Sequence, residues 1–212
     1  MLDNSTGDWR SARKASATAD IVAVAWELAR ENGLSGLSLR DLARRLGMAA
    51  PSLYSYFASK NALYDAMFAD GYRAFLALEA PVDGPDLRTA LRSNAEQFVR
   101  FGTEDPVRFM LLFQRTIPGF EPSPESWDLA QQAYDKSFAS LHAWAELTQE
   151  DLDVVSACIT GLISQQVAND PGGSRWTDRL DDVIDLLLPR LQDKAKKPSP
   201  TRGRSAKKKE GT

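Results

Sequence analysis

The 212-residue sequence contains a single cysteine, Cys158, and a single histidine, His142. One cysteine excludes a disulfide framework within the chain, and one histidine excludes a His-rich zinc site. We expect Cys158 to be a small buried residue. No run approaches the roughly 18 uninterrupted apolar residues of a membrane span. Residues 1–20 contain three aspartates where a secretory signal would have an apolar segment. These absences predict a cytoplasmic protein with no membrane partner.

Patterns for catalysis and cofactor binding are also missing. One histidine leaves little material for a Ser-His-Asp or Cys-His arrangement. Gly102 and the pair Gly172-Gly173 do not form a phosphate-binding loop. His142 is expected to be an ordinary core or surface residue, with orientation of a ligand as the alternative. We therefore expect no enzymatic activity, no metal and no cofactor.

The net charge of −3 conceals an uneven distribution along the chain. Residues 1–60 hold 8 Lys/Arg against 6 Asp/Glu, residues 61–193 hold 10 against 22, and residues 194–212 hold 8 against 1. A solvated surface would explain each block. If the chain contacts nucleic acid, the contact is expected from the two basic ends and not from the acidic middle.

The apolar residues recur with helical spacing almost throughout. Ile21, Ala25 and Leu28 stand at i, i+4 and i+7 before Gly33, and no long stretch alternates apolar and polar residues as a strand would. The fold class is therefore expected to be all-α. Helices are expected over residues 17–32, 38–46, 51–56, 59–78, 86–103, 106–115, 124–146, 149–169 and 176–192.

Residues 37–60, LSLRDLARRLGMAAPSLYSYFASK, carry the most specific pattern. Two short helical segments meet at Gly47, a spacing typical of a helix-turn-helix, whose second helix enters the DNA major groove. The small side chain of Ala43 allows close approach of the second helix, and Leu53 and Phe57 are expected to point inward. The outer face then presents hydroxyl groups and phenol rings, which suit phosphates and thymine methyl groups.

The run LSLRDLARRLGM followed by APSLYSYFASK and then by Ala62-Leu63 resembles the DNA-binding domain of TetR-family transcriptional regulators. Residues 109–120 and 161–169 also resemble one subgroup of these regulators, more weakly. The resemblance implies an N-terminal three-helix DNA-binding domain and a C-terminal helical domain for effector binding and dimerisation. It implies a bacterial homodimeric repressor that binds a double-stranded DNA operator and responds to a small-molecule effector.

The resemblance also assigns DNA contacts, position by position. Tyr54 and Lys60 match phosphate-contacting positions, and Arg40 matches a residue that reaches a base or a phosphate. The family often has histidine at the place of Tyr56 and a polar residue at the place of Ala50, so these two contacts differ here. The expected DNA-binding set is Arg40, Ala50, Pro51, Ser52, Tyr54, Tyr56 and Lys60.

Large apolar side chains gather in the consecutive helices that follow. Aromatic residues at helical spacing are commonly core residues, but as a set they also fit an apolar pocket with few polar groups. The expected ligand is aromatic or hydrophobic, and the acidic excess of this region leaves a cation as an alternative. The expected effector pocket is Phe98, Phe101, Met110, Phe113, Trp127, Tyr134 and Phe138, with Gln165 as a polar anchor.

Dimerisation is expected because one helix-turn-helix reads too few base pairs for useful specificity. The last two helices carry apolar stripes that could form a four-helix bundle with a second copy. The alternative is that both stripes face the core of their own subunit. The expected interface residues are Leu152, Val155, Ile159, Leu162, Leu187 and Leu191.

Four segments are expected: a disordered arm over 1–14, the helix-turn-helix domain over 15–60, the effector and dimerisation domain over 61–193, and a disordered basic tail over 194–212. The function predicted from them is sequence-specific transcriptional regulation, as a repressor released from a palindromic operator, in a nucleoid-associated protein. The alternative function is non-specific or architectural nucleic-acid binding that depends on the basic tail.

Overall fold

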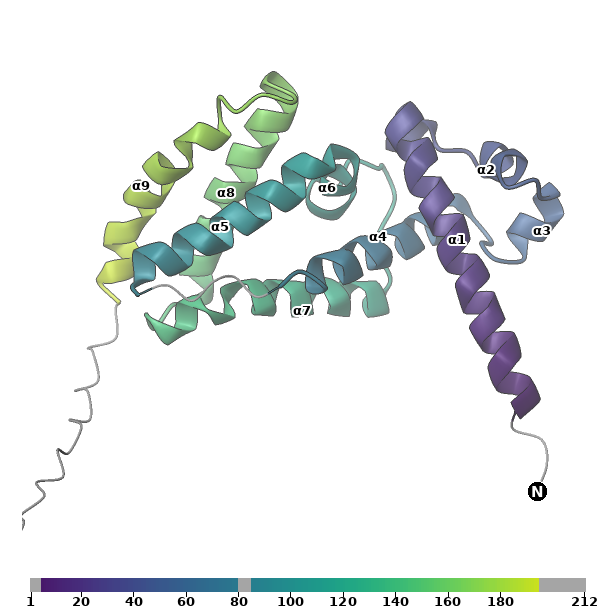
Figure 1. Ribbon diagram of the computed structural model, residues 1–212, viewed down its shortest axis with the longest axis horizontal. Helices are drawn as coiled ribbons and strands as arrows, with labels where there is room; N and C mark the ends of the chain where they lie inside the picture. The colour runs from purple at the N-terminus through teal and green to yellow at the C-terminus, as the bar shows by residue number, and fades with distance from the viewer. Residues whose placement is uncertain (1–4, 80–84, 195–212) are drawn as a thin grey trace, which may run out of the picture.

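The structure is a computed structural model that describes residues 5–79 and 85–194. Within these ranges the chain is helical and contains no strand, which confirms the all-α prediction. The α-helices are α1 (Ser5–Gly36), α2 (Leu39–Arg45), α3 (Ala50–Tyr54), α4 (Lys60–Leu76), α5 (Leu87–Glu104), α6 (Pro106–Phe113), α7 (Pro124–Ala139), α8 (Gln149–Asn169) and α9 (Leu180–Gln192). Helices α2 and α3 lie at one end of the elongated molecule, and α8 and α9 lie at the other (Figure 1).

Two expected boundaries are wrong. Helix α1 begins at Ser5, so residues 5–14 are helical and do not form the expected arm; after Gly7 no glycine or proline interrupts this segment before Gly33. The helix expected over 124–146 ends at Ala139 and is followed by a 3₁₀ turn, Leu141–Ala143. Residues 1–4 of the predicted arm and residues 195–212 of the predicted basic tail lie outside the described residues.

The N-terminal core joins helices α1 to α4 with inward-facing parts of α5, α6 and α7. It includes Leu42 and Leu53 of the short helices, Met67 of α4 and Leu112 of α6, all of them buried. Short helices such as α2 and α3 cannot bury enough apolar surface to be stable alone. Their position is therefore set by the longer helices on which they pack.

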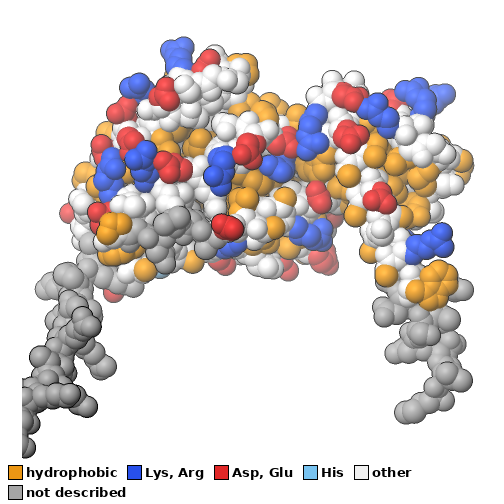
Figure 2. All heavy atoms as spheres, viewed as in Figure 1, with side chains coloured by type: hydrophobic (Ala, Val, Ile, Leu, Met, Phe, Trp, Pro, Cys, Tyr) orange, Lys and Arg blue, Asp and Glu red, His pale blue; other side chains and the backbone are white. Residues whose placement is uncertain are grey.

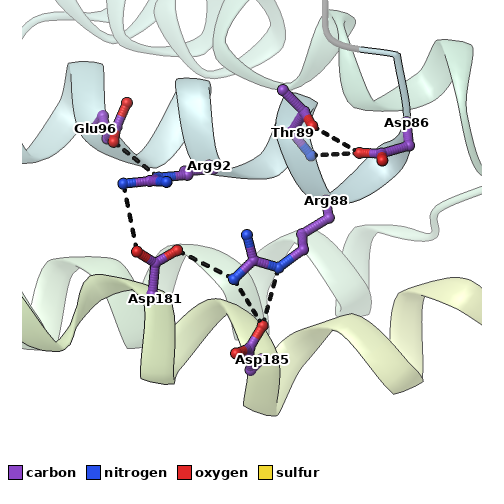
Figure 3. A network of polar contacts seen from close by, with 7 residues as sticks. All are labelled: Asp86, Arg88, Thr89, Arg92, Glu96, Asp181 and Asp185. Carbon is purple, nitrogen blue, oxygen red and sulfur yellow. Dashed lines mark hydrogen bonds and ion pairs between the residues drawn. The ribbon is translucent and has the colours of Figure 1, made fainter.

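The C-terminal core is built mainly from α5, α8 and α9. Leu91, Ile163 and Ile184 are fully buried in it. On the outside, Arg88 and Arg92 of α5 bridge to Asp181 and Asp185 of α9 (Figure 3), with Nη2 of Arg88 3.1 Å from Oδ1 of Asp181. These side chains are largely exposed, so the bridges add less to stability than the buried apolar contacts do.

A buried carboxylate fixes the end of α9 against the start of α8. Asp151 has no exposed side-chain surface, and it accepts hydrogen bonds from Nζ of Lys194 and, at 3.0 Å, from Nε of Arg190. It also accepts from the backbone nitrogen and hydroxyl of Thr148 and thereby caps α8. These bonds, that from Lys194 first, hold the pKa of Asp151 well below its usual range.

Within the described ranges, none of the helices combines the length and the apolar character needed to cross a bilayer.

Candidate nucleic-acid interface and effector cavity

The turn between α2 and α3 has helix-turn-helix geometry. Ser38 caps α2, and Gly47 ends the turn at φ 64°, in the left-handed region that a glycine adopts without strain. The backbone nitrogen of Met48 donates to the carbonyl of Ala43 at 2.9 Å and closes the turn. Leu53 and Phe57 are buried, as expected, so the outer face of α3 is held at a fixed position.

The residues predicted to contact DNA divide into exposed and packed sets. Arg40, Pro51, Ser52 and Tyr54 are exposed, and Tyr54 keeps 54% of its surface accessible. Ala50 and Tyr56 are half-buried and pack against the N-terminal core. Figure 2 shows Lys and Arg side chains at the α2 end of this region with Asp and Glu side chains beside them, as over α5 and α9. The contacts of all these residues with DNA stay predictions.

Lys60, the first residue of α4, contacts the end of α1. Its Nζ donates to the carbonyl of Ser35 at 2.9 Å and lies 5.3 Å from the ring centroid of Tyr64. The Tyr64 hydroxyl donates to the carbonyl of Leu34 at 2.5 Å. An ammonium group has three donors, so this bond leaves two for a phosphate. By contrast, Arg44 is paired with Asp41 on its own helix, at 2.6 Å.

An apolar cavity of about 250 Å³ lies between α4, α5, α7 and α8. Its walls come from both cores: Tyr72 and Phe75 belong to the N-terminal core, and Leu91 and Ile159 belong to the C-terminal core. The structure brings together five of the predicted pocket residues on its lining, namely Phe98, Phe113, Trp127, Tyr134 and Phe138.

Three predicted pocket residues do not line this cavity. Phe101 turns into the N-terminal core, where its ring centroid lies 4.8 Å from that of Phe75. Met110 packs against the same core from α6. Gln165 is exposed on α8 and accepts a hydrogen bond from Asn169 at 2.7 Å, so it cannot anchor a ligand in the cavity.

The polar groups of the cavity were not found from the sequence. They are Asn94, Gln131, Ser137 and Ser156. Asn94 is 8% exposed, and its Nδ2 donates to the hydroxyl of Ser140 at 2.9 Å. A signal was present, because Asn94 stands three residues after Leu91 and four before Phe98, on the apolar face of a helix.

The residues predicted for the dimer interface do not lie on the outer surface of the subunit, and their part in a dimer stays a prediction. The stripes of α8 and α9 are needed to cover α5, so they are buried inside their own subunit, which was the alternative left open. Val154 and Leu186 are exposed instead, the latter by 81%. Cys158, expected to be buried, is exposed on α8 as well. The buried set is Leu152, Val155, Ile159, Leu162, Leu187 and Leu191.

Helix α6 contacts both the first helix and the cavity. Asp105 caps α6 by accepting from the backbone nitrogen of Arg108 at 3.1 Å, and its other oxygen accepts from Nη2 of Arg30 on α1 at 2.6 Å. At the far end of α6, Phe113 lines the cavity, and the carbonyl of Leu112 accepts from the Tyr72 hydroxyl at 3.3 Å. Burial raises the pKa of Tyr72 well above its ordinary value, so this hydroxyl stays protonated.

Comparison with known proteins bears on the helix-turn-helix. Residues 21–67, which run from α1 into α4, match the family described as "Bacterial regulatory proteins, tetR family". This segment is a TetR-family domain. The resemblance to the TetR-family DNA-binding domain that was inferred from the sequence is therefore confirmed for residues 21–67.

Named relatives extend the match beyond the TetR-family domain. The HTH-type transcriptional repressor Rv1353c of Mycobacterium tuberculosis H37Rv is 30% identical over 139 residues, which are 65% of this chain and 51% of the relative. The tetracycline repressor protein class D of Escherichia coli is 35% identical over 80 residues, covering 38% of this chain and 37% of the relative. The chain thus spans about half or less of these curated relatives.

One solved structure shows that the likeness of fold is not confined to the TetR-family domain. A singly substituted TetR from Acinetobacter baumannii AYE, in complex with minocycline, is 21% identical. It aligns over 91% of this chain and 98% of that chain, with a TM-score of 0.55. The overall arrangement of helices is therefore shared.

Proposed function

We propose that the protein is a homodimeric TetR-family transcriptional regulator, a repressor that leaves its palindromic operator when a small effector fills the cavity. One observation carries the proposal: the same chain holds an exposed helix-turn-helix and an apolar cavity whose walls come from both hydrophobic cores. A protein that only bound DNA would not need such a cavity.

In the proposed complex, α3 lies in the major groove. The hydroxyl groups of Ser52 and Tyr54 reach phosphates, and Pro51 offers an apolar contact to a thymine methyl group. Lys60 adds a phosphate contact at the start of α4, where the helix N-terminus also favours negative charge. Arg40 approaches the backbone or a base edge from α2.

The effector is proposed to act by population shift. A ligand can change DNA affinity only through different affinities for two arrangements of the protein. Because the cavity walls belong to both cores, a bound ligand favours one relative position of these cores. A change in the relative position of the cores moves α6, and the Asp105–Arg30 pair transmits this movement to α1. Helix α1 in turn packs against the helix-turn-helix.

Dimerisation is proposed through the outward faces of α8 and α9. Leu186 and Val154 are exposed large apolar residues, and each loses this exposure if two copies pack as a four-helix bundle. A two-fold dimer places two copies of α3 about 34 Å apart, one turn of DNA, or a multiple of that spacing. The two inverted half-sites of a palindrome are related by the same two-fold symmetry as the two subunits.

The proposal can be tested by selecting binding sites from a random duplex pool with the full chain. We expect enrichment of a palindrome, and gel shifts in which Arg40→Ala and Tyr54→Phe weaken binding about 5- to 30-fold. Arg100→Ala is the matched control: it removes an exposed arginine of α5 and should leave affinity unchanged.

The outcome against the proposal is a pool with no enriched sequence and binding that bulk competitor DNA removes. If deletion of residues 195–212 then abolishes that binding, the chain is the tail-driven, non-specific binder named as the alternative.

A further inference from the structure

The cavity walls carry no charge although the surrounding segment is strongly acidic. None of the described residues on the lining is Asp, Glu, Lys, Arg or His. Two carboxylates accept hydrogen bonds from lining side chains: Asp135 accepts from Nε2 of Gln131 at 2.8 Å, and Asp153 accepts from the Tyr134 hydroxyl at 3.3 Å. Neither carboxylate is itself on the lining. Lys136 donates to the carbonyls of Leu76 and Leu78 at 2.7 Å each, so its charge is used to cap α4. An ion in this cavity would lose its hydration without gaining a counter-charge.

One side-chain amide on the lining, that of Asn94, can orient a ligand in the cavity. Nδ2 of Asn94 donates to the hydroxyl of Ser140, and this bond fixes the orientation of the amide plane. No described group donates to the carbonyl oxygen Oδ1 of Asn94. This oxygen is not among the described side-chain atoms that are both buried and unpartnered, so it keeps accessible surface although the residue as a whole is only 8% exposed on the lining. An accessible acceptor on an apolar lining is open to a ligand, and a hydroxyl or N–H group of that ligand would donate to it.

The remaining walls favour a flat ring. Phe98 and Phe113 meet edge to face at 5.0 Å, and Tyr134 and Phe138 do so at 4.8 Å. Aromatic ligands match such walls through the same edge-to-face and offset contacts. Trp127 lines the cavity and is 46% exposed, which places it at the mouth. The volume of about 250 Å³ is below the roughly 300–1,000 Å³ typical of sites for drug-sized molecules.

We propose that the cavity binds an uncharged aromatic molecule of one or two fused rings whose hydroxyl or amide N–H group donates to Oδ1 of Asn94. This inference rests on the proposed function only in calling that molecule the effector. It replaces the cation that the acidic composition left open, because the acidic residues are absent from the walls.

The test measures binding of four probes to the full chain by equilibrium dialysis at pH 7, without DNA. The probes share one ring system: 2-naphthol, naphthalene, 2-naphthoate and 2-naphthylmethylammonium. We expect 2-naphthol to bind about 5- to 10-fold more tightly than naphthalene, because of its hydrogen bond. We expect it to bind at least about 100-fold more tightly than either ion, because of the cost of burying an unpaired charge.

Two variants separate the role of Asn94 from a general effect on packing. Asn94→Leu keeps the size of the side chain and removes Oδ1, so the preference for 2-naphthol over naphthalene should disappear. Ser140→Ala breaks the same Asn94–Ser140 hydrogen bond but keeps Oδ1, so that preference should remain. Circular dichroism and a thermal melt check that both variants are folded.

An ion that binds as tightly as 2-naphthol overturns the proposal, and so does an absence of binding by all four probes. These comparisons use the unaltered chain, so they hold even if Asn94→Leu fails to fold. An unchanged 2-naphthol preference in folded Asn94→Leu overturns it as well. Sequence-specific DNA binding is measured separately: its absence, with probe binding intact, would reject the proposed function and leave the ligand chemistry standing.

Discussion

The two hydrophobic cores are built from different kinds of helix. The N-terminal core holds the five-residue α3 and the seven-residue α2 against longer helices, whereas the C-terminal core is formed by α5, α8 and α9, with 18, 21 and 13 residues. The first core supports a surface that must stay exposed, while the second buries most of the apolar residues of its helices. The comparison indicates that α2 and α3 are stabilised by packing on longer helices, whereas α5, α8 and α9 are stabilised by packing on one another.

The cavity lies where these two cores meet. A ligand placed wholly inside either core would stabilise that core alone and would leave its relation to the other unchanged. At the junction, the same ligand contacts Phe75 on one side and Ile159 on the other. A small molecule can therefore bias the position of one core relative to the other. Four substitutions can test this picture.

The largest effect is expected for Leu187→Glu in the C-terminal core. Leu187 is 5% exposed, so the variant buries an unpaired carboxylate and should lose more than about 4 kcal/mol, enough to unfold this core. Leu186→Glu is the matched control, one residue earlier and 81% exposed. It should change the stability of a subunit by less than about 0.5 kcal/mol while weakening the dimer.

Urea unfolding and sedimentation velocity distinguish the two effects. A folded Leu187→Glu variant that is merely monomeric would mean that this residue is an interface residue after all. An intact dimer in Leu186→Glu would reject the proposed outward face.

Asp151→Asn should have the next largest effect, about 2 kcal/mol, because it weakens the α8 cap and leaves Lys194 and Arg190 without their carboxylate. The folded pKa is lowered, so the contribution of Asp151 is complete above about pH 5 and declines as the pH falls below the ordinary carboxyl pKa of about 3.9. In thermal melts between pH 7 and pH 2, the melting temperature of the variant should therefore fall less than that of the unaltered chain. An equal fall in melting temperature for both proteins would contradict the stabilising role of the Asp151 carboxylate.

Asp105→Ala should cost about 1–2 kcal/mol, because it removes the cap of α6 and the partner of Arg30 together. Asp105→Asn keeps an acceptor for the cap and should cost less. A double-mutant cycle with Arg30→Ala measures the coupling between α1 and α6. If the effector response of DNA binding survives with that coupling removed, the signal takes another route.

The smallest change concerns Lys60→Ala at the DNA surface. We expect a several-fold loss of affinity for specific and bulk DNA alike, and a salt dependence whose slope falls by about 1. Because Lys60 also bonds the carbonyl of Ser35, a thermal melt must accompany the binding titration. An unchanged slope would show that Lys60 serves only to hold α4 against α1.

The helix-turn-helix could be predicted from the sequence because its signals are local. Ser38 caps α2, Gly47 supplies the left-handed turn, and Pro51 falls in the first turn of α3, where a missing N–H costs nothing. Each signal acts within a few residues. The boundaries of α2 and α3 therefore lie within about two residues of those expected.

The cavity and the dimer face were less accessible to sequence reasoning, because periodicity shows which side of a helix is apolar and not what covers it. Leu187 and Leu191 form an apolar stripe in either case, and only packing against α5 decides that they are internal. Phe101 and Phe98 lie on the same helix, yet only Phe98 reaches the cavity. A single polar residue such as Asn94 does not alter an apolar period, so periodicity alone does not mark it as a cavity residue.

One carboxylate with two partners has an evolutionary consequence. A replacement of Asp105 by serine or asparagine could still cap α6, but it would release the guanidinium of Arg30. Selection on the cap alone would therefore tolerate changes that selection on the contact with α1 would not. Among relatives that respond to an effector, we expect positions 30 and 105 to change together, as an Arg–Asp pair or as a substitute pair.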